Sequence, residues 1–243
     1  MSDIVIRQVT PEITTFSKPF NKLFGLLPMG GRSTAVKLSD GTVWVVASTP
    51  LSPETKEAID AMGLVEYIMA ASADHHFFLT EWQKAYPEAK IIGVLGLAEK
   101  KQAESWKFTG SYGVDPAGTT YGFEDEIQAT YFPGFSKHDV AWLHLSSKTL
   151  IVADLIFNLP ATEQYSASSK PKAKPAFFLP KLEPYSEGFR KFLWGEGKDK
   201  EAMKRDAKTV AGWDFERIIM CHGDIIEKDA KKAWESAFAK YLS

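Results

Sequence analysis

Apolar and polar residues alternate along the first part of the chain in the manner of antiparallel strands. The alternation covers Ile4–Val9, Ile13–Phe20 and Ser33–Lys37, and it predicts strands with one buried face. The sequence Ser-Asp-Gly-Thr at 39–42 contains Asp-Gly, which favours a tight hairpin. We therefore expect a further strand over Thr42–Val46 and an antiparallel sheet in this part of the chain.

A helix with clear end signals follows at 52–63. Ser52 is a suitable N-cap, Pro53 suits the first helical position, and Gly63 suits the C-terminal end. Strand-like and helix-like segments then alternate: a strand at Val65–Ala70, a helix at Leu79–Tyr86, a strand at Ile91–Val94 and a helix at Ala98–Ala103. This alternation favours a sheet with helices packed on it.

The second half of the chain returns to strands and ends in helices. The apolar runs predict strands at Ile127–Phe132, Val140–Leu145 and Thr149–Ala153. Two helices, Lys200–Val210 and Asp229–Tyr241, are predicted to close the chain, with the strand Arg217–Met220 between them. No internal repeat is visible.

The segment 158–188 lies between the last predicted strand before it, Thr149–Ala153, and the predicted helix Lys200–Val210. It contains five prolines, which disfavour regular structure. It also contains Phe177, Phe178 and Leu179, three apolar residues that we expect to be buried. An interdomain linker would be polar throughout. We therefore favour a long loop that folds over a single domain spanning residues 1–243, and we keep the linker as the alternative.

Composition narrows the class of protein. The chain has 243 residues, of which 44% are hydrophobic, so it can bury a substantial core. The net charge of −2 gives no basic excess for binding nucleic acid. No signal peptide is recognisable, and no apolar run reaches the length of a membrane span. A single cysteine, Cys221, fits a reducing compartment, so we expect a soluble cytoplasmic protein without a membrane partner.

Polar residues follow four of the predicted strands at their C-terminal ends, where open α/β sheets place their sites. These sequences are Ala-Asp-His-His at 73–76, Gly-Phe-Ser-Lys-His-Asp at 134–139, Ala-Asp at 153–154 and Cys-His-Gly-Asp at 221–224. Aspartate and histidine together are ligands that suit zinc or iron. The pattern indicates a metal site.

The order of these sequences resembles the metallo-β-lactamase fold superfamily. Its pattern is His-x-His-x-Asp-His after one strand, a Gly-His loop, an Asp ending a later strand and a last His. Asp74 and His75 match the Asp-His pair, Asp154 matches the later aspartate and His222 matches the last histidine. The stretch at 32–53 is also similar to the superfamily's first hairpins. The resemblance implies an α/β fold, a four-layer αββα sandwich of two mixed β-sheets with helices outside.

The chain departs from this pattern at three ligand positions. The first two histidines of the motif fall on Ala70 and Ser72, and the Gly-His position reads Gly134-Phe135. The resemblance therefore implies that one of the family's two metal sites is lost. The other site retains its residues, so we expect at most one transition metal ion, zinc in the first place and iron in the second.

Several histidines and one aspartate have ordinary structural interpretations as well. His75 and His76 could exchange roles, so that one is a ligand and the other packs or faces solvent. Asp74 could cap the helix that follows it. His138 could replace the lost Gly-His ligand or form a local hydrogen bond, and His144 reads as a satisfied strand histidine.

Asp154 and His222 are harder to explain structurally. A buried carboxylate without a partner costs several kcal/mol, and Asp154 follows a strongly apolar strand. His222 lies between Cys221 and Gly223, and we interpret it as functional. Cys221 could be a soft ligand, although the resemblance implies a small buried residue at this position.

Three functions are consistent with these residues. The first is a mononuclear metal-dependent hydrolase, in which Asp74 or Asp154 accepts a proton and Phe177 and Phe178 form a lid over a small-molecule substrate. The second is a metal-free or structurally metallated protein that binds a small molecule or a partner. The third is redox chemistry at a mononuclear iron site. Metal content separates the second function from the other two, and metal identity separates the first from the third.

Overall fold

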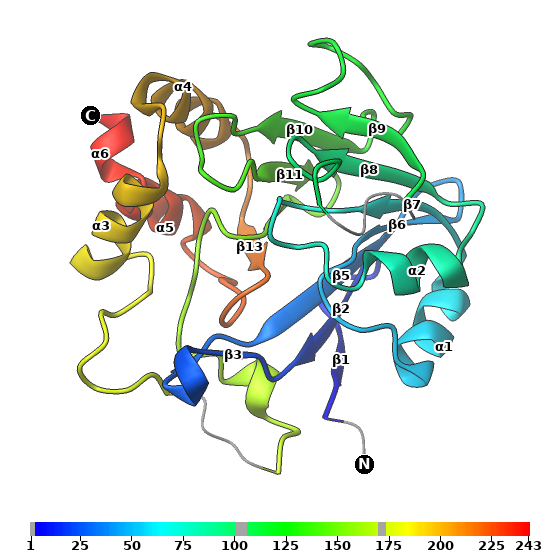
Figure 1. Cartoon of the computed structure of the whole chain (residues 1–243), viewed down its shortest axis with the longest axis horizontal. Coiled ribbons are helices and arrows are strands. Elements are labelled where there is room, and N and C mark those ends of the chain that lie inside the picture. Colours follow the sequence, from blue (N-terminus) through cyan, green and yellow to red (C-terminus); the bar gives the residue numbers. More distant parts are fainter. Residues whose placement is uncertain (1–2, 101–105, 170–173) are drawn as a thin grey trace.

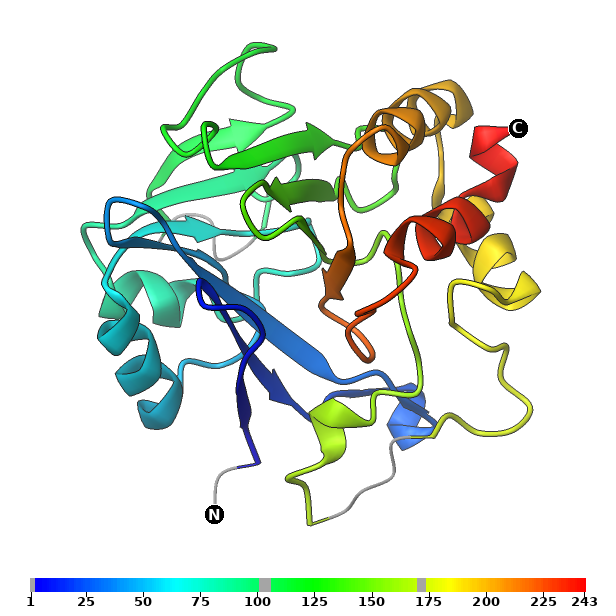
Figure 2. The same ribbon diagram turned by 180° about the vertical axis from the view of Figure 1, so that it is seen from behind.

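Two β-sheets lie at the centre of the molecule, and helices cover their outer faces (Figure 1). The structure is a computed structural model, and it describes residues 3–100, 106–169 and 174–243. Helices α1 (Pro53–Met62) and α2 (Leu79–Ala85) lie on one side of the sheets. The helices of the C-terminal third lie on the other side, as the view from behind in Figure 2 also shows. The arrangement is the predicted αββα sandwich.

The first sheet has seven strands in the order β1-β2-β5-β6-β7-β8-β9. Its first four strands pair antiparallel, and β6 to β9 pair parallel. The strands are β1 (Val5–Gln8), β2 (Ile13–Lys18), β5 (Gly31–Lys37), β6 (Thr42–Val46), β7 (Leu64–Met69), β8 (Lys90–Val94) and β9 (Phe108–Tyr112). A separate small hairpin joins β3 (Asn21–Lys22) to β4 (Leu27–Pro28) through the 3-10 turn η1 (Leu23–Gly25).

The second sheet has four strands in the order β10-β11-β12-β13. The strands are β10 (Ile127–Tyr131), β11 (Val140–His144), β12 (Thr149–Val152) and β13 (Arg217–Met220). The last pair is parallel, so β12 and β13 end at the same edge of the sheet. This register brings the residues that follow the two strands close together.

Helices of the second half pack on the outer face of the second sheet. They are α3 (Glu187–Glu196), α4 (Lys200–Ala211), α5 (Ala230–Ala237) and α6 (Ala239–Leu242). The short 3-10 helix η3 (Glu163–Tyr165) instead contacts β2 of the first sheet. Ile151 and Ile219 point into the core between the sheets, whereas Leu150 and Ile218 pack under the helices. Strands buried on both faces need continuous apolar runs, which explains why β12 and β13 do not alternate in sequence.

Most predicted elements are confirmed with small shifts of their ends. Ser52 caps α1 by accepting a hydrogen bond from the Thr55 backbone N–H, as predicted. The sequence analysis missed β9 and α3, and the predicted helix at 229–241 divides at Phe238 into α5 and α6. Of the helix predicted at 98–103, residues 98–100 form turns, and the rest lies outside the described residues.

The described parts of the proline-rich segment fold onto the second sheet's helices. Leu159, Tyr165 and Leu182 are buried in the same apolar cluster as α3 to α6. The single domain over residues 1–243 stays a prediction. Phe177 and Phe178, however, are 99% and 63% exposed. The expectation that both are buried is therefore wrong. No helix within the described ranges is long and apolar enough to cross a membrane.

Candidate metal centre

Three predicted residues meet at the ends of β7, β12 and β13. His75, Asp154 and His222 each offer one ligand atom, and these atoms lie within 4.8 Å of one another. We call these three residues the ligand group. The Oδ1 atom of Asp154 is 3.3 Å from Nε2 of His75 and 3.3 Å from Nε2 of His222. Two imidazoles and one carboxylate converging in this way can hold a transition metal ion.

His222 is oriented by the backbone carbonyl of Gly30, the residue directly before β5. Its Nδ1 atom is 2.6 Å from the carbonyl oxygen of Gly30. A carbonyl only accepts hydrogen bonds, so Nδ1 carries the proton. Burial lowers the pKa of His222 and favours its neutral form. The lone pair of Nε2 then faces a carboxylate oxygen of Asp154, and two such acceptors are stabilised by a cation between them.

His75 is oriented by a side chain. Its Nδ1 atom is 3.1 Å from the Ser48 hydroxyl, which also accepts a hydrogen bond from the Cys221 thiol at 3.3 Å. Burial acts to lower the pKa of His75, but Cys221 and Asp154 outweigh it and raise this pKa well above its usual range. Cys221 is buried and lies outside the ligand group. The centre therefore attracts positive charge, either a proton or a metal ion.

Both carboxylate oxygens of Asp154 are occupied. Oδ1 lies between the two imidazoles, and Oδ2 accepts a hydrogen bond from Nζ of Lys137 at 2.9 Å. Burial acts to raise the pKa of Asp154, but His75 outweighs it and holds this pKa well below its usual value. A carboxylate that stays ionised and has both oxygens engaged is suited to binding a cation. It is poorly suited to accepting a proton during a reaction.

Lys137 was missed by the sequence analysis, although it lies in the Gly-Phe-Ser-Lys-His-Asp sequence after β10. Its Nζ atom also lies 3.5 Å from Oδ2 of Asp74. Burial acts to lower the pKa of Lys137, but Asp154 and Asp74 outweigh it and raise this pKa, so the ammonium stays charged. Its backbone carbonyl accepts from the Ala73 N–H at 2.8 Å and ties this loop to the His75 turn. The signal in the sequence was a lysine two residues after Phe135, the aromatic residue at the Gly-His position.

The three groups line a cavity with a volume of about 660 Å³. Asp74, His75, Asp154 and His222 form its polar part. The other lining residues are Lys18, Pro19, Phe20, Lys22, Gly31, Ala47, Ser48, Thr49, Pro50, His76, Phe77 and Phe78. A cavity of this size with apolar walls and a few convergent polar groups is typical of a small-molecule site.

Solved structures share this architecture over the whole chain. DIM-1 metallo-β-lactamase is 12% identical at a TM-score of 0.63, with 98% of each chain covered. A metallo-β-lactamase from Hirschia baltica is 8% identical at 0.62, covering 99% of this chain and 98% of its own. The chain has the metallo-β-lactamase fold. FIM-1 from Pseudomonas aeruginosa, solved in a mono-zinc form, is 10% identical at 0.59, covering 100% and 98%. No protein-family model and no curated protein sequence matches the chain.

Three positions that carry histidines in the superfamily's pattern carry other residues in this chain. Ala70, Ser72 and Phe135 are buried and bring no imidazole to the centre. The ammonium group of Lys137 lies against the oxygen of Asp154 that faces away from the two imidazoles. None of these four residues adds a ligand beside His75, Asp154 and His222.

The structure separates the remaining predicted residues from the ligand group. Asp74 lines the cavity with its side chain 49% exposed, and it pairs with Lys137 instead of joining the ligand atoms. The capping interpretation of Asp74 is wrong, because the N-cap of α2 is Phe78 and has no side-chain cap bond. The structure places His76 against Phe77 and Trp106, with ring centroids 4.7 and 5.7 Å apart. His75 is therefore the histidine that faces the ligand group.

Two further histidines have local partners. Nδ1 of His138 is 3.1 Å from the hydroxyl of Tyr131, which matches the local interpretation. His144 is buried in β11 with Ser146 and Ser147 as partners, as predicted. Phe177 and Phe178 do not line the cavity. A lid formed by these two residues stays a prediction.

Proposed function

We propose that the chain is a hydrolase-like protein that depends on one transition metal ion and acts on a small molecule. The observation that carries the proposal is the pair of facing acceptors. Because Nδ1 of His222 donates to the Gly30 carbonyl, its Nε2 lone pair is directed at Asp154 Oδ1, 3.3 Å away. His75 has the same arrangement if its Nδ1 donates to Ser48. Ligand histidines in metal sites are oriented in this way by a hydrogen bond from the other ring nitrogen.

The number of metal ions follows from Lys137. A carboxylate that bridges two metal ions through its two oxygens would need Oδ2, but Oδ2 of Asp154 is 2.9 Å from the Lys137 ammonium. A second cation there would meet this positive charge at close range. The proposal is therefore a mononuclear site in which Lys137 supplies the second positive charge.

Zinc is the metal we propose first. Catalytic zinc sites use three protein ligands and leave a position open, and this group has three members. When bound, such a metal supplies Lewis acidity that makes water reactive near neutral pH. Iron is second, because two histidines and one carboxylate also form the ligand set of non-haem iron sites. We also propose a cytoplasmic location, because a chain with a single cysteine suits a reducing compartment.

The residues around the ligands would handle substrate and protons. Asp74 lines the cavity and is not a member of the ligand group, so it is our choice for the group that accepts a proton. Lys137 would hold Asp74 and Asp154 at a constant separation through its two contacts. Phe20, Phe77 and Phe78 would bind the apolar part of a substrate.

Metal content is the decisive measurement. Protein purified without added metal should contain about one zinc per chain in elemental analysis. His222→Ala should lower the metal affinity at least a hundredfold, and a chelator should lower the melting temperature of the wild type but hardly that of the variant. A ligand at a hundredfold excess over Kd stabilises the native state by about 2.7 kcal/mol. His144→Gln is the control and should respond like the wild type.

Other results would point elsewhere. Two tightly bound metal ions would contradict the role of Lys137, and iron with oxygen-sensitive activity would favour the redox alternative. If neither metal nor a chelator effect is found, the metal-free binding protein is the better interpretation. Activity is tested with chromogenic esters, β-lactams and phosphodiesters. Hydrolysis should follow metal content and should be lost in Asp74→Asn although that variant retains its metal.

A further inference from the structure

Five exposed apolar side chains lie together at one edge of the molecule. We call Leu23, Phe24, Leu26, Phe177 and Phe178 the apolar tip. Leu23 to Leu26 lie in and beside the turn between β3 and β4, and residues 177–178 belong to the neighbouring loop. A backbone hydrogen bond of 2.9 Å from Ala176 to the Leu26 carbonyl joins the two segments. Both ribbon views show the hairpin and this loop side by side at the lower edge (Figures 1 and 2).

The backbone of the hairpin presents these side chains to solvent. Leu23 and Phe24 have φ values of 51° and 53°, in the left-handed region that is unfavourable for residues with a side chain. Strain of about 1 kcal/mol or more per residue persists only where something else compensates for it. Phe24 is fully exposed, and Leu23 is 52% exposed, so burial within the chain does not provide the compensation.

The charges around the apolar tip have one sign. The segments 18–28 and 174–181 contain Lys18, Lys22, Lys174 and Lys181, and neither segment contains an aspartate or a glutamate. Within the described ranges none of these four ammonium groups forms an ion pair, whereas Lys56, Lys90 and Lys148 elsewhere on the surface do. The two segments that carry the apolar tip therefore contribute four lysines without an ion pair among the described residues, in a chain whose net charge is −2.

We propose that the apolar tip is a peripheral binding surface for anionic lipid bilayers. Exposed aromatic and aliphatic side chains enter the boundary between headgroups and acyl chains, while lysines around them attract anionic headgroups. A protein partner is the less favoured occupant, because the side chains stand on two loop tips and none of the five lines the cavity. The expectation of no membrane partner rested on the lack of a spanning segment, and surface binding does not require one.

The position of the surface relates it to the cavity. Lys18, Phe20 and Lys22 line the cavity and lie in or directly before the β3–β4 hairpin that carries Phe24. A bilayer bound at the apolar tip would therefore lie beside the cavity mouth. Binding of the bilayer itself needs no metal, so it can be tested independently of the proposed function.

The test is co-sedimentation of the full chain with vesicles. Phosphatidylcholine vesicles containing phosphatidylserine should bind the protein, vesicles of phosphatidylcholine alone should bind it much less, and salt should weaken the binding. Lys22→Gln/Lys174→Gln/Lys181→Gln should lower the partition coefficient about a hundredfold, at roughly fivefold per lysine. Phe24→Ala/Phe177→Ala/Phe178→Ala should lower it at least as much.

Matched variants control for charge and hydrophobicity. Lys84→Gln/Lys208→Gln/Lys228→Gln makes the same change of net charge at exposed positions elsewhere, and Leu64→Ala/Val114→Ala removes exposed apolar side chains away from the apolar tip. Both should bind like the wild type. The proposal is overturned if the wild type ignores phosphatidylserine or if the tip variants bind equally well. Concentration-dependent self-association lost only in the phenylalanine variant, without vesicle binding, would instead identify a second copy of the chain as the occupant.

Discussion

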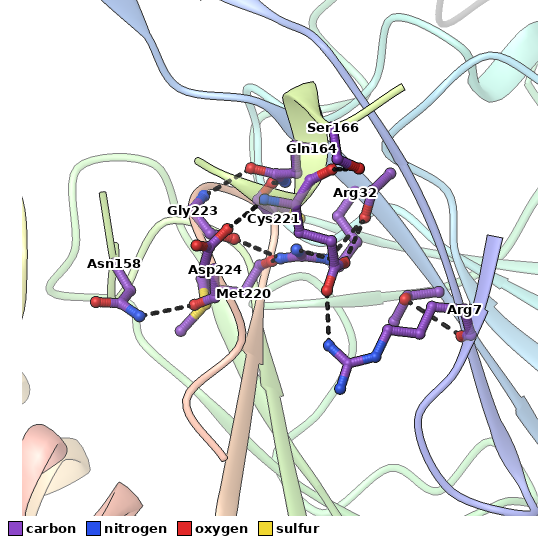
Figure 3. A network of polar contacts seen from close by, with 12 residues as sticks. Arg7, Arg32, Asn158, Gln164, Ser166, Met220, Cys221, Gly223 and Asp224 are labelled. Carbon is purple, nitrogen blue, oxygen red and sulfur yellow. Dashed lines mark hydrogen bonds and ion pairs between the residues drawn. The ribbon is translucent and has the colours of Figure 1, made fainter. Parts of the chain in front are cut away.

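The two histidines of the ligand group are held in different ways. The loop that carries His222 is fixed by a buried polar network, shown in Figure 3. The Arg32 guanidinium is fully buried and donates to the carbonyls of Met220 and Gly223 at 2.7 Å each, one on either side of His222. Gln164 donates to the Cys221 carbonyl and accepts from the Gly223 N–H. These four hydrogen bonds from Arg32 and Gln164 are all made to the backbone of the loop.

Two glycines make this close packing feasible. Gly30, whose carbonyl accepts from His222, has φ +68°, and a Cβ there would lie 1.9 Å from Gln164 Oε1. Gly223 has φ +94°, and a Cβ there would lie 2.3 Å from the carbonyl oxygen of Asn158. Only glycine satisfies both the conformation and the space.

The turn that carries His75 has no comparable support. Its backbone is held by the bond from Ala73 to the Lys137 carbonyl and by one from His75 N–H to the Ser72 carbonyl. Among the described residues, the hydrogen-bond partners of the imidazole are the Ser48 hydroxyl and Asp154. The ligand group therefore combines a preorganised half with a half that depends on single side-chain contacts, and preorganisation decides how tightly a site holds its ligand.

The largest effect should come from removing the network beneath His222. Arg32→Met leaves Glu163 and two backbone carbonyls without their buried partner, and breaking a buried pair of this kind costs about 3–5 kcal/mol. Urea unfolding at neutral pH measures the loss. Lys191→Met, which removes an exposed ammonium group paired with the exposed Glu187, should change stability by less than about 1 kcal/mol. A small loss for Arg32→Met would show that the loop is fixed without the network.

The same network should give the stability a pH dependence. Burial acts to raise the pKa of Glu163, but Arg32 and Arg7 outweigh it and hold this pKa below its usual value of 4.5. With the folded pKa below the unfolded one, the contribution is present above about pH 4.5 and is lost as the pH falls through the folded pKa.

Glu163→Gln should consequently destabilise the protein by about 3 kcal/mol at pH 7. Its difference from the wild type should shrink towards pH 3. Thermal melts of both proteins across this range provide the measurement, with the exposed Glu187→Gln as the control. A difference that does not change with pH would exclude an ionised Glu163 as the source.

The smallest effect should appear at His75, the histidine that is held by fewer contacts. Ser48→Ala removes the hydroxyl that orients His75, and loss of such an outer partner lowers metal affinity by about tenfold. Competition with a fluorescent chelator measures the affinity, and unfolding by urea should hardly change. Ser146→Ala, which removes a partner of His144, is the matched control. Equal affinities for Ser48→Ala and the wild type would mean that Asp154 alone orients His75.

Local patterns predicted the elements that carry the site. Ser52, Pro53 and Gly63 set the ends of α1 because capping depends on neighbouring residues. The apolar strands β12 and β13 were recognisable from their sequences, and Asp154 and His222 follow them. A carboxylate in an apolar surrounding is destabilised unless it has a polar or charged partner. This cost of burial indicated Asp154, and the resemblance to the superfamily's last histidine indicated His222.

Packing between distant segments decided the rest. The sequence showed two adjacent histidines, but only the position of the turn against Ser48 and Asp154 selects His75 and turns His76 towards Trp106. Lys137 acquired its role because the loop after β10 meets the ends of β7 and β12. Spacing along one strand or helix specifies which side chains share a face. Contacts between loops depend on how whole sheets and helices pack, and no short stretch of sequence contains that information.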